Sequence, residues 1–170
     1  MNSFQSLWWE QAKSDHDIFL LLLGLRSSTH CHPLHYLQMT TEKIAKAYFW
    51  RSGSPPPKDH AGFVQFLRFL AQVRRSEQVR VANVFEFKRS DDFQSWLRQS
   101  LPIARELERL APSLASHGPN VEYPWPHAQP QFAPATYNFP LWEKLMSGPG
   151  RRMMRIIGSA VHRFPEYADT

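Results

Sequence analysis

An amphipathic helix over residues 32–50 is the feature that most constrains the fold. The segment HPLHYLQMTTEKIAKAYFW repeats apolar side chains three and four residues apart, as a helix with one buried face requires. Pro33 stands in the first turn, where proline is tolerated. Such a face must pack against other elements, so the segment predicts a helical core. The apolar face consists of Leu34, Leu37, Thr41, Ile44, Ala45 and Tyr48.

A strip of polar side chains runs beside that apolar face. At about 100° per residue, it contains His35, Gln38, Glu42 and Lys46. Asp15 of the preceding segment lies near apolar residues, and a buried carboxylate needs a partner, which Lys43 or Lys46 offers. Two interpretations stay open: a solvated helix flank, or a polar network between two helices. The predicted network consists of Asp15, Gln38, Glu42, Lys43 and Lys46.

The first half of the chain favours helices separated by breaks. Apolar spacing predicts a first helix over 3–23, and Gly24 is a stop signal. Three consecutive prolines within 52–59 end the next helix, and a third is expected over 60–73. Residues 74–90 fit a strand by their β-branched content, but no partner strand is visible. We therefore expect a short helix there.

The second half combines helices with a proline-rich segment. A helix is expected over 91–110, and Pro102 inside it should kink it or split it in two. Residues 112–140 are rich in proline and aromatic side chains and have no helical period. They are too aromatic for a flexible linker, so we expect an extended arm strapped across the bundle. Two short helices, over 141–146 and 151–164, close the chain.

Composition limits the class of protein. A chain of 170 residues suits one domain, and its single cysteine excludes an internal disulfide. The longest apolar run, IFLLLLGL, is too short to cross a bilayer, and the first residues lack the basic start of a signal peptide. We expect a cytoplasmic protein without a membrane partner. The predicted parts are a helical bundle (1–113), the arm (114–140) and a C-terminal helical extension (141–170), within one compact all-α domain.

The ordered motifs W-x(3)-A-x(2)-D and H-Y-L-Q-x(3)-E-K-x(2)-K-A resemble the HEPN superfamily of prokaryotic all-α domains. They are followed, after a proline-bearing loop, by a histidine. The likeness covers about 8–73 and is weaker to 124, where Glu122 of NVEYP stands in place of an arginine that related members often carry. The motif residues are Trp8, Ala12, Asp15, His35, Tyr36, Leu37, Gln38, Glu42, Lys43, Lys46, Ala47 and His60.

This resemblance implies an up-and-down helical bundle that pairs as a homodimer. It also implies a role in bacterial defence, toxin–antitoxin or RNA-related systems, with RNA, a nucleotide or a cognate nucleotidyltransferase-type protein as partner. Active HEPN ribonucleases use an arginine followed after four to six residues by a histidine. Two pairs match that spacing, Arg26 with His32 and Arg155 with His162. About two such matches arise by chance in a chain of this composition, so Arg155 and His162 are only weak catalytic candidates.

The last predicted helix carries a cationic face. Net charge is +5, which permits a polyanionic partner. A solvated face, a phosphate or nucleic-acid contact and a membrane-surface helix all remain open for this helix. The predicted nucleic-acid or phosphate-binding residues are Arg151, Arg152, Arg155 and His162.

Metal and cofactor motifs are absent from the sequence. His30, Cys31, His32 and His35 are close together, but no C-x(2)-C pair, H-E-x(2)-H motif or Walker loop accompanies them. We therefore expect no metal and no cofactor. The favoured function is non-catalytic binding of nucleic acid, a nucleotide or a partner protein. The alternatives are a dimeric, metal-independent endoribonuclease, and a structural interaction module whose partner docks on exposed aromatics of the arm.

Overall fold

The chain folds into packed helices. The computed structural model describes residues 1–25, 29–53, 55–56, 62–115, 118–125 and 131–170. Within these ranges the architecture is all-α, as expected, and β pairing is limited to an isolated bridge between Trp125 and Phe132. None of the helices described there is long and apolar enough to span a membrane. The α-helices are α1 (Ser3–Gly24), α2 (Cys31–Phe49), α3 (Phe63–Ala71), α4 (Arg75–Val84), α5 (Ser90–Glu108), α6 (Pro112–Ala115), α7 (Pro140–Met146) and α8 (Gly148–His162).

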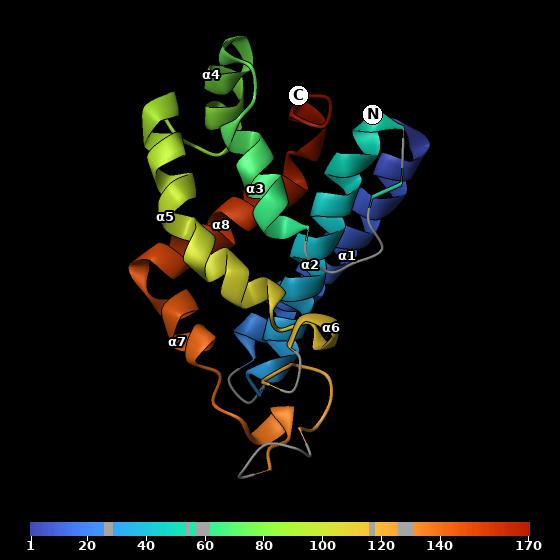
Figure 1. Cartoon of the computed structure of the whole chain (residues 1–170), viewed down its shortest axis with the longest axis vertical. Coiled ribbons are helices and arrows are strands. Elements are labelled where there is room, and N and C mark those ends of the chain that lie inside the picture. The colour runs from blue at the N-terminus through green and yellow to red at the C-terminus, as the bar shows by residue number, and fades with distance from the viewer. Residues whose placement is uncertain (26–28, 54, 57–61, 116–117, 126–130) are drawn as a thin grey trace.

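Helices α1 and α2 form the central pair, and they lie side by side along their length (Figure 1). Asn2 caps α1: its side chain accepts from the Gln5 backbone N–H, and the Gln5 side chain accepts from the Asn2 N–H. The apolar face predicted for residues 32–50 is confirmed, because all its members are buried. Ala12 and Phe19 of α1 join the same core. The periodicity of one segment thus identified the centre of the fold.

Helices α3 and α5 pack on α2 and on each other, and α4 packs on α5 at the far end (Figure 1). The helix expected within 74–90 is confirmed as α4. The third helix is shorter than the predicted 60–73, and His60 lies outside the described residues. Of the two outcomes predicted for Pro102, a kinked or a split helix, the split is wrong, because α5 is continuous through Pro102. Pro102 is exposed, so the carbonyl that loses its helical N–H partner has access to water.

The proline-rich segment folds at one end of the bundle (Figure 1). The aromatic side chains of this segment pack on one another and also against the core of the bundle. Tyr137 lies 4.7 Å from Trp125 and 4.9 Å from Phe139, measured between ring centroids. Trp125 and Phe139 are buried, whereas Tyr123 is 60% exposed. The exposed aromatic docking surface predicted for the arm is therefore reduced to Tyr123 among the described residues.

The C-terminal helices contribute to the same hydrophobic core as the bundle. Helix α8 passes behind α5 in Figure 1 and supplies Ile157 and Val161 to that core. After it, the 3-10 turn η3 (Phe164–Glu166) leads to Tyr167, whose buried hydroxyl donates to the Ala160 carbonyl at 2.7 Å. Burial raises the pKa of Tyr167 well above its ordinary value, so this hydroxyl stays protonated and keeps donating.

We predict that Gly150→Ala destabilises the protein by about 1–3 kcal/mol. A Cβ at this position would overlap the backbone of Lys144 and Leu145, which cannot move without displacing α7. Gly148→Ala is the matched control, because a Cβ at Gly148 meets no atom within 4 Å. Urea unfolding curves measure both variants. Equal unfolding midpoints for the two would contradict a close α7–α8 backbone approach.

Candidate functional site

The polar strip of α2 is buried and joins α2 to α1. Lys43 Nζ lies 2.5 Å from Asp15 Oδ2, and the two side chains are 12% and 6% exposed. On the next turn, Lys46 Nζ lies 2.6 Å from Glu42 Oε1, and Gln38 donates to Glu42 Oε2 at 3.3 Å. These contacts exclude a solvated flank at these residues. The helix spacing brings the charges together, and burial makes their pairing necessary.

Aromatic packing encloses this polar network. The Lys46 ammonium lies 5.0 Å from the ring centroid of Trp8, so a cation–π contact adds to its ion pair. Gln11 donates to Asp15 Oδ1 at 3.2 Å and occupies the second carboxylate oxygen. All four charges therefore have partners. The arrangement suits the fixing of two helices against one another rather than the binding of a substrate.

A histidine at the end of the same strip meets the NVEYP segment. His35 Nδ1 lies 3.6 Å from Glu122 Oε1, with both side chains 29% exposed. The Asn120 side chain accepts from the backbone N–H groups of Glu122 and Tyr123, at 2.9 and 2.7 Å, and fixes this turn. Glu122, which stands where the resemblance suggested an arginine, thus faces a histidine. Their separation exceeds a normal hydrogen bond.

The four cationic residues predicted on α8 do not converge on a single site. Arg151 donates to the Met146 carbonyl, and the Arg152 guanidinium lies 4.4 Å from the Phe87 ring centroid. Arg152 lines a hollow with Asp92, whereas Arg155 and His162 line a separate groove. The structure therefore brings together the two weak catalytic candidates but places Arg151 and Arg152 elsewhere. Arg26, of the other matching pair, lies outside the described residues.

That groove contains a third residue that the sequence analysis missed, His16 of α1. Its ring centroid lies 5.2 Å from that of His162, in an edge-on arrangement, and only 3% of the residue is exposed. Its pKa is lowered, chiefly because burial disfavours the charged imidazolium and next because His162 is near; Asp17 acts in the opposite direction. The sequence indicated that His16 would be buried, because it stands four residues after the core residue Ala12 and therefore on the same face of the helix.

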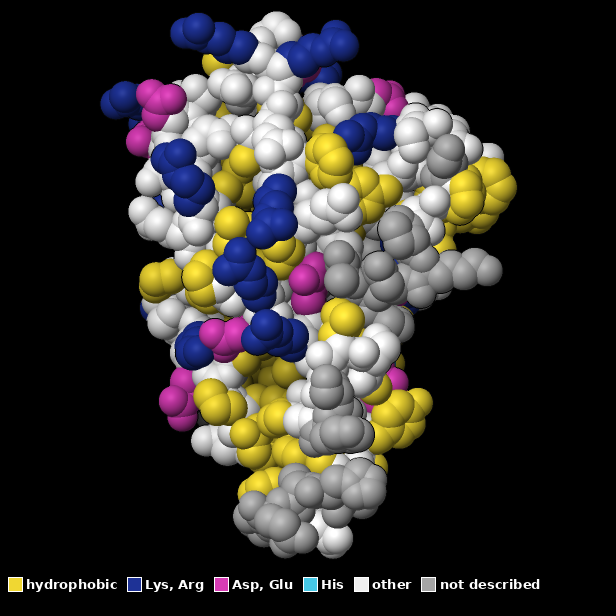
Figure 2. Space-filling view, in the orientation of Figure 1, with side chains coloured by type: hydrophobic (Ala, Val, Ile, Leu, Met, Phe, Trp, Pro, Cys, Tyr) yellow, Lys and Arg dark blue, Asp and Glu magenta, His cyan; other side chains and the backbone are white. Residues whose placement is uncertain are grey.

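A stripe of arginines on α3 and α5 was also missed. Figure 2 shows Lys and Arg side chains gathered over these two helices on one face. On α5, Arg98, Arg105 and Arg109 lie within about 40° of one another at 100° per residue, and all three are exposed. Arg68 is the exposed arginine of α3. We call these four residues the arginine stripe. Its seven- and four-residue spacing was visible in the sequence.

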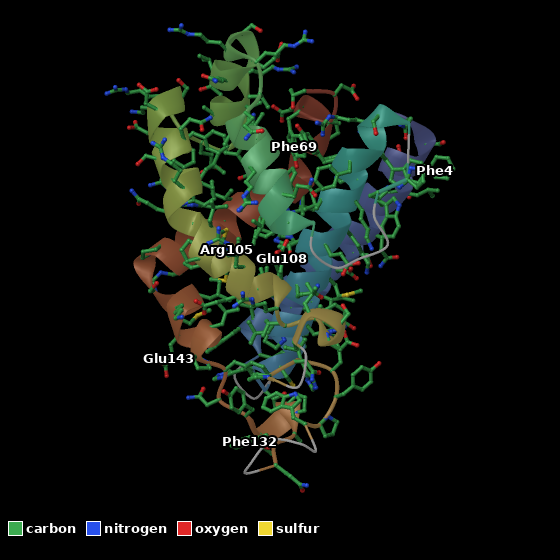
Figure 3. The ribbon with its side chains drawn as sticks, viewed as in Figure 1. Phe4, Phe69, Arg105, Glu108, Phe132 and Glu143 are labelled. Carbon is green, nitrogen blue, oxygen red and sulfur yellow. The ribbon has the colours of Figure 1, made fainter. Side chains whose placement is uncertain are left out.

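A neighbouring face of α5 explains why the stripe faces outward. Glu108 is buried, and its Oε1 accepts from the Val64 N–H at 2.7 Å, at the start of α3. A carboxylate there satisfies a free helix N–H and complements the helix dipole. Figure 3 labels Glu108 and Arg105, which lie three residues apart on α5. Glu108 thus ties α5 to α3, whereas Arg105 remains at the surface.

Metal-ligand geometry is not found among the described residues. No group of three or more His, Cys, Asp or Glu side chains there is placed to hold a metal ion. Within the predicted His/Cys cluster, Cys31 is buried and His30 stacks on Trp142 at a centroid distance of 4.8 Å. Cys31 and His30 thus have packing roles, and packing is the common state of a small buried cysteine.

Comparison with known proteins adds no assignment. No family model, no curated protein and no solved structure matches this chain. The likeness to the HEPN superfamily therefore rests on the motif residues alone and stays a prediction. Of those residues, Asp15, Gln38, Glu42, Lys43 and Lys46 occupy the buried network.

We predict that Lys43→Ala destabilises the protein by about 3–5 kcal/mol, because it leaves the Asp15 carboxylate buried without its cation. Replacing both partners together, Asp15→Leu with Lys43→Met, should restore most of this loss. Lys144→Ala is the control, because its pair with Glu106 is exposed and worth at most about 1 kcal/mol. Urea unfolding measures all three. A Lys43→Ala loss no larger than that of Lys144→Ala would refute the buried brace.

We predict that stability falls as the pH drops below about 6.5, the ordinary histidine pKa. The lowered pKa means that unfolded His16 binds a proton at a pH where folded His16 does not, so acid favours unfolding. The groups facing it are His162 and Arg155 from α8, Asp17 from α1, and Glu86. His16→Gln should flatten the profile of unfolding free energy between pH 7 and 5, whereas exposed His32→Gln should not. Parallel pH profiles for the wild type and His16→Gln would contradict this account.

Proposed function

We propose that the protein is a non-catalytic nucleic-acid-binding protein and that the arginine stripe holds the phosphate backbone. The observation that carries the proposal is the unpaired state of the stripe. Arg68, Arg98, Arg105 and Arg109 are exposed, and none forms a hydrogen bond or ion pair with another described residue. A surface arginine without an acidic neighbour keeps its full charge and its planar array of donors for an external anion.

Several other surface cations of the protein are paired. Lys144 contacts Glu106 at 2.7 Å, Arg80 contacts Glu77 at 2.7 Å, and Arg163 contacts Glu166 at 2.6 Å. The stripe differs from these three pairs in having several like charges, none of which forms an ion pair with another described residue. Like charges on one face repel one another at a cost that an anionic partner removes. This contrast favours a polyanion over a merely solvated face.

The length of the stripe suits a polymer better than a single phosphate. From Arg98 to Arg109 the helix rises about 16 Å at 1.5 Å per residue. Arg68 adds a fourth exposed arginine on α3, the helix that packs on α5. Binding of this kind releases counterions, carries little sequence information and falls steeply with salt. Single-stranded RNA is the partner that the predicted HEPN likeness favours.

The α8 groove supports a second candidate function, the endoribonuclease. The specific observation is that Arg155 and His162 line one groove. Against catalysis stands the burial of the nearby His16, whose Nδ1 atom is inaccessible. An acid and a base must both reach the scissile group. Homodimerisation, a nucleotidyltransferase-type partner, a defence or toxin–antitoxin setting and a cytoplasmic location remain proposals that the HEPN likeness suggests.

We predict that a 20-nucleotide single-stranded RNA binds the protein through the stripe. Replacing Arg98, Arg105 and Arg109 together by alanine should weaken binding and reduce the slope of log affinity against log salt by about 2, since each phosphate contact contributes about 0.7. Fluorescence anisotropy at several salt concentrations measures this.

The matched control replaces Arg151, Arg152 and Arg155 together by alanine, which removes the same charge from α8. Equal losses in the two triple variants would show that net charge, rather than the stripe, determines binding. A loss confined to the α8 variant would move the interface to α8. RNA recovered uncut after incubation is the expected result, and cleavage abolished by His162→Ala would establish the nuclease instead.

A further inference from the structure

A groove of about 440 Å³ lies between the second half of α1 and the second half of α8. Its wall is mostly apolar, with Phe19, Leu20 and Leu23 from α1 and Met154 from α8. Leu20 and Leu23 are 47% and 37% exposed. The volume is within the range of small-molecule sites, about 300–1,000 Å³. Apolar side chains of this size gain free energy when a ligand covers them.

A cation and two histidines also line this groove. Arg155 is exposed and has no ion pair with any other described residue, and His162 is exposed beside it. His16 is only 3% exposed, and its Nδ1 is inaccessible, so Arg155 is the charged group on this wall that a ligand can reach. Glu86 and Arg163 line the groove too, and Arg163 is paired with Glu166.

We propose that this groove binds a small organic acid with an apolar body, such as a medium-chain carboxylate. The apolar body covers Phe19, Leu20 and Leu23, and the carboxylate pairs with Arg155 beside the two histidines. The proposal is independent of nucleic-acid binding, because the groove and the arginine stripe share no residue.

Charge and shape decide among ligand classes. An amine would meet the guanidinium of Arg155 as a like charge, and inorganic phosphate would leave the leucines exposed to water. A neutral hydrocarbon would fill the apolar part but gain nothing from Arg155. An amphipathic acid is the class that satisfies both parts of the groove. Gly158 lies close beside His16: a Cβ added there would stand in ordinary contact with the His16 ring, at 3.5 Å.

The test compares decanoate, decanol and decylamine by isothermal titration calorimetry, below their aggregation concentrations. We expect decanoate to bind at least tenfold more tightly than decanol and decylamine not to bind. In Arg155→Gln the preference for decanoate over decanol should disappear, whereas Arg151→Gln, a change on the same helix outside the groove, should keep it.

A second variant blocks the apolar part. Leu20→Glu changes an exposed side chain, so the fold should persist, and it should abolish binding of decanoate and decanol alike. Three outcomes would overturn the proposal: no heat of binding with any probe, equal affinity for decanoate and decanol, or the same loss in Arg151→Gln as in Arg155→Gln. Far-ultraviolet circular dichroism of every variant confirms that losses are not due to unfolding.

Discussion

The ion pair between Asp15 and Lys43 is the constraint on which the remaining structure depends. Two charges buried between α1 and α2 tolerate few relative positions of these helices, because a shift of one turn would leave each without its partner. Apolar packing alone is more permissive, since leucine and alanine surfaces interdigitate in several registers. The Glu42–Lys46 pair and the ring of Trp8 add a second contact on the next turn. We infer that the polar network specifies register more than it adds stability.

That register also positions the groove on the other side of α1. Asp15 and His16 are consecutive, so they point about 100° apart. One faces α2 through Lys43, and the other faces α8 through His162 and Gly158. Fixing the rotation of α1 against α2 therefore fixes which side chains meet α8. The Asp15–Lys43 pair thus determines which side chains of α1 line the groove beside α8.

Sequence reasoning reached the features that depend on local spacing. The buried face of α2, the helix at α4 and the offer of a lysine to Asp15 follow from helical periodicity and from the need of a buried carboxylate for a cation. It failed where the outcome depends on elements distant in sequence. The continuity of α5 through Pro102 depends on which side of the helix faces water, and the packing of Trp125, Tyr137 and Phe139 on one another and against the core depends on the tertiary fold. The sequence left open whether Lys43 or Lys46 pairs with Asp15, because that choice depends on how α1 and α2 are aligned along their axes.

For the candidate surfaces, too, the local spacing was visible in the sequence, whereas the contacts between distant elements were not. The spacing of Arg98, Arg105 and Arg109 is local, but their exposure depends on Glu108, which ties a neighbouring face of α5 to α3 and leaves the arginines outside. His16 is likewise visible in sequence, whereas its partner is 146 residues away, from the difference of the two residue numbers. Acidic side chains of this protein are largely committed to other cations, as in the pairs of Glu106, Glu77 and Glu166. Because those acids are committed, the positive charge of the stripe and of Arg155 is left for partners outside the chain.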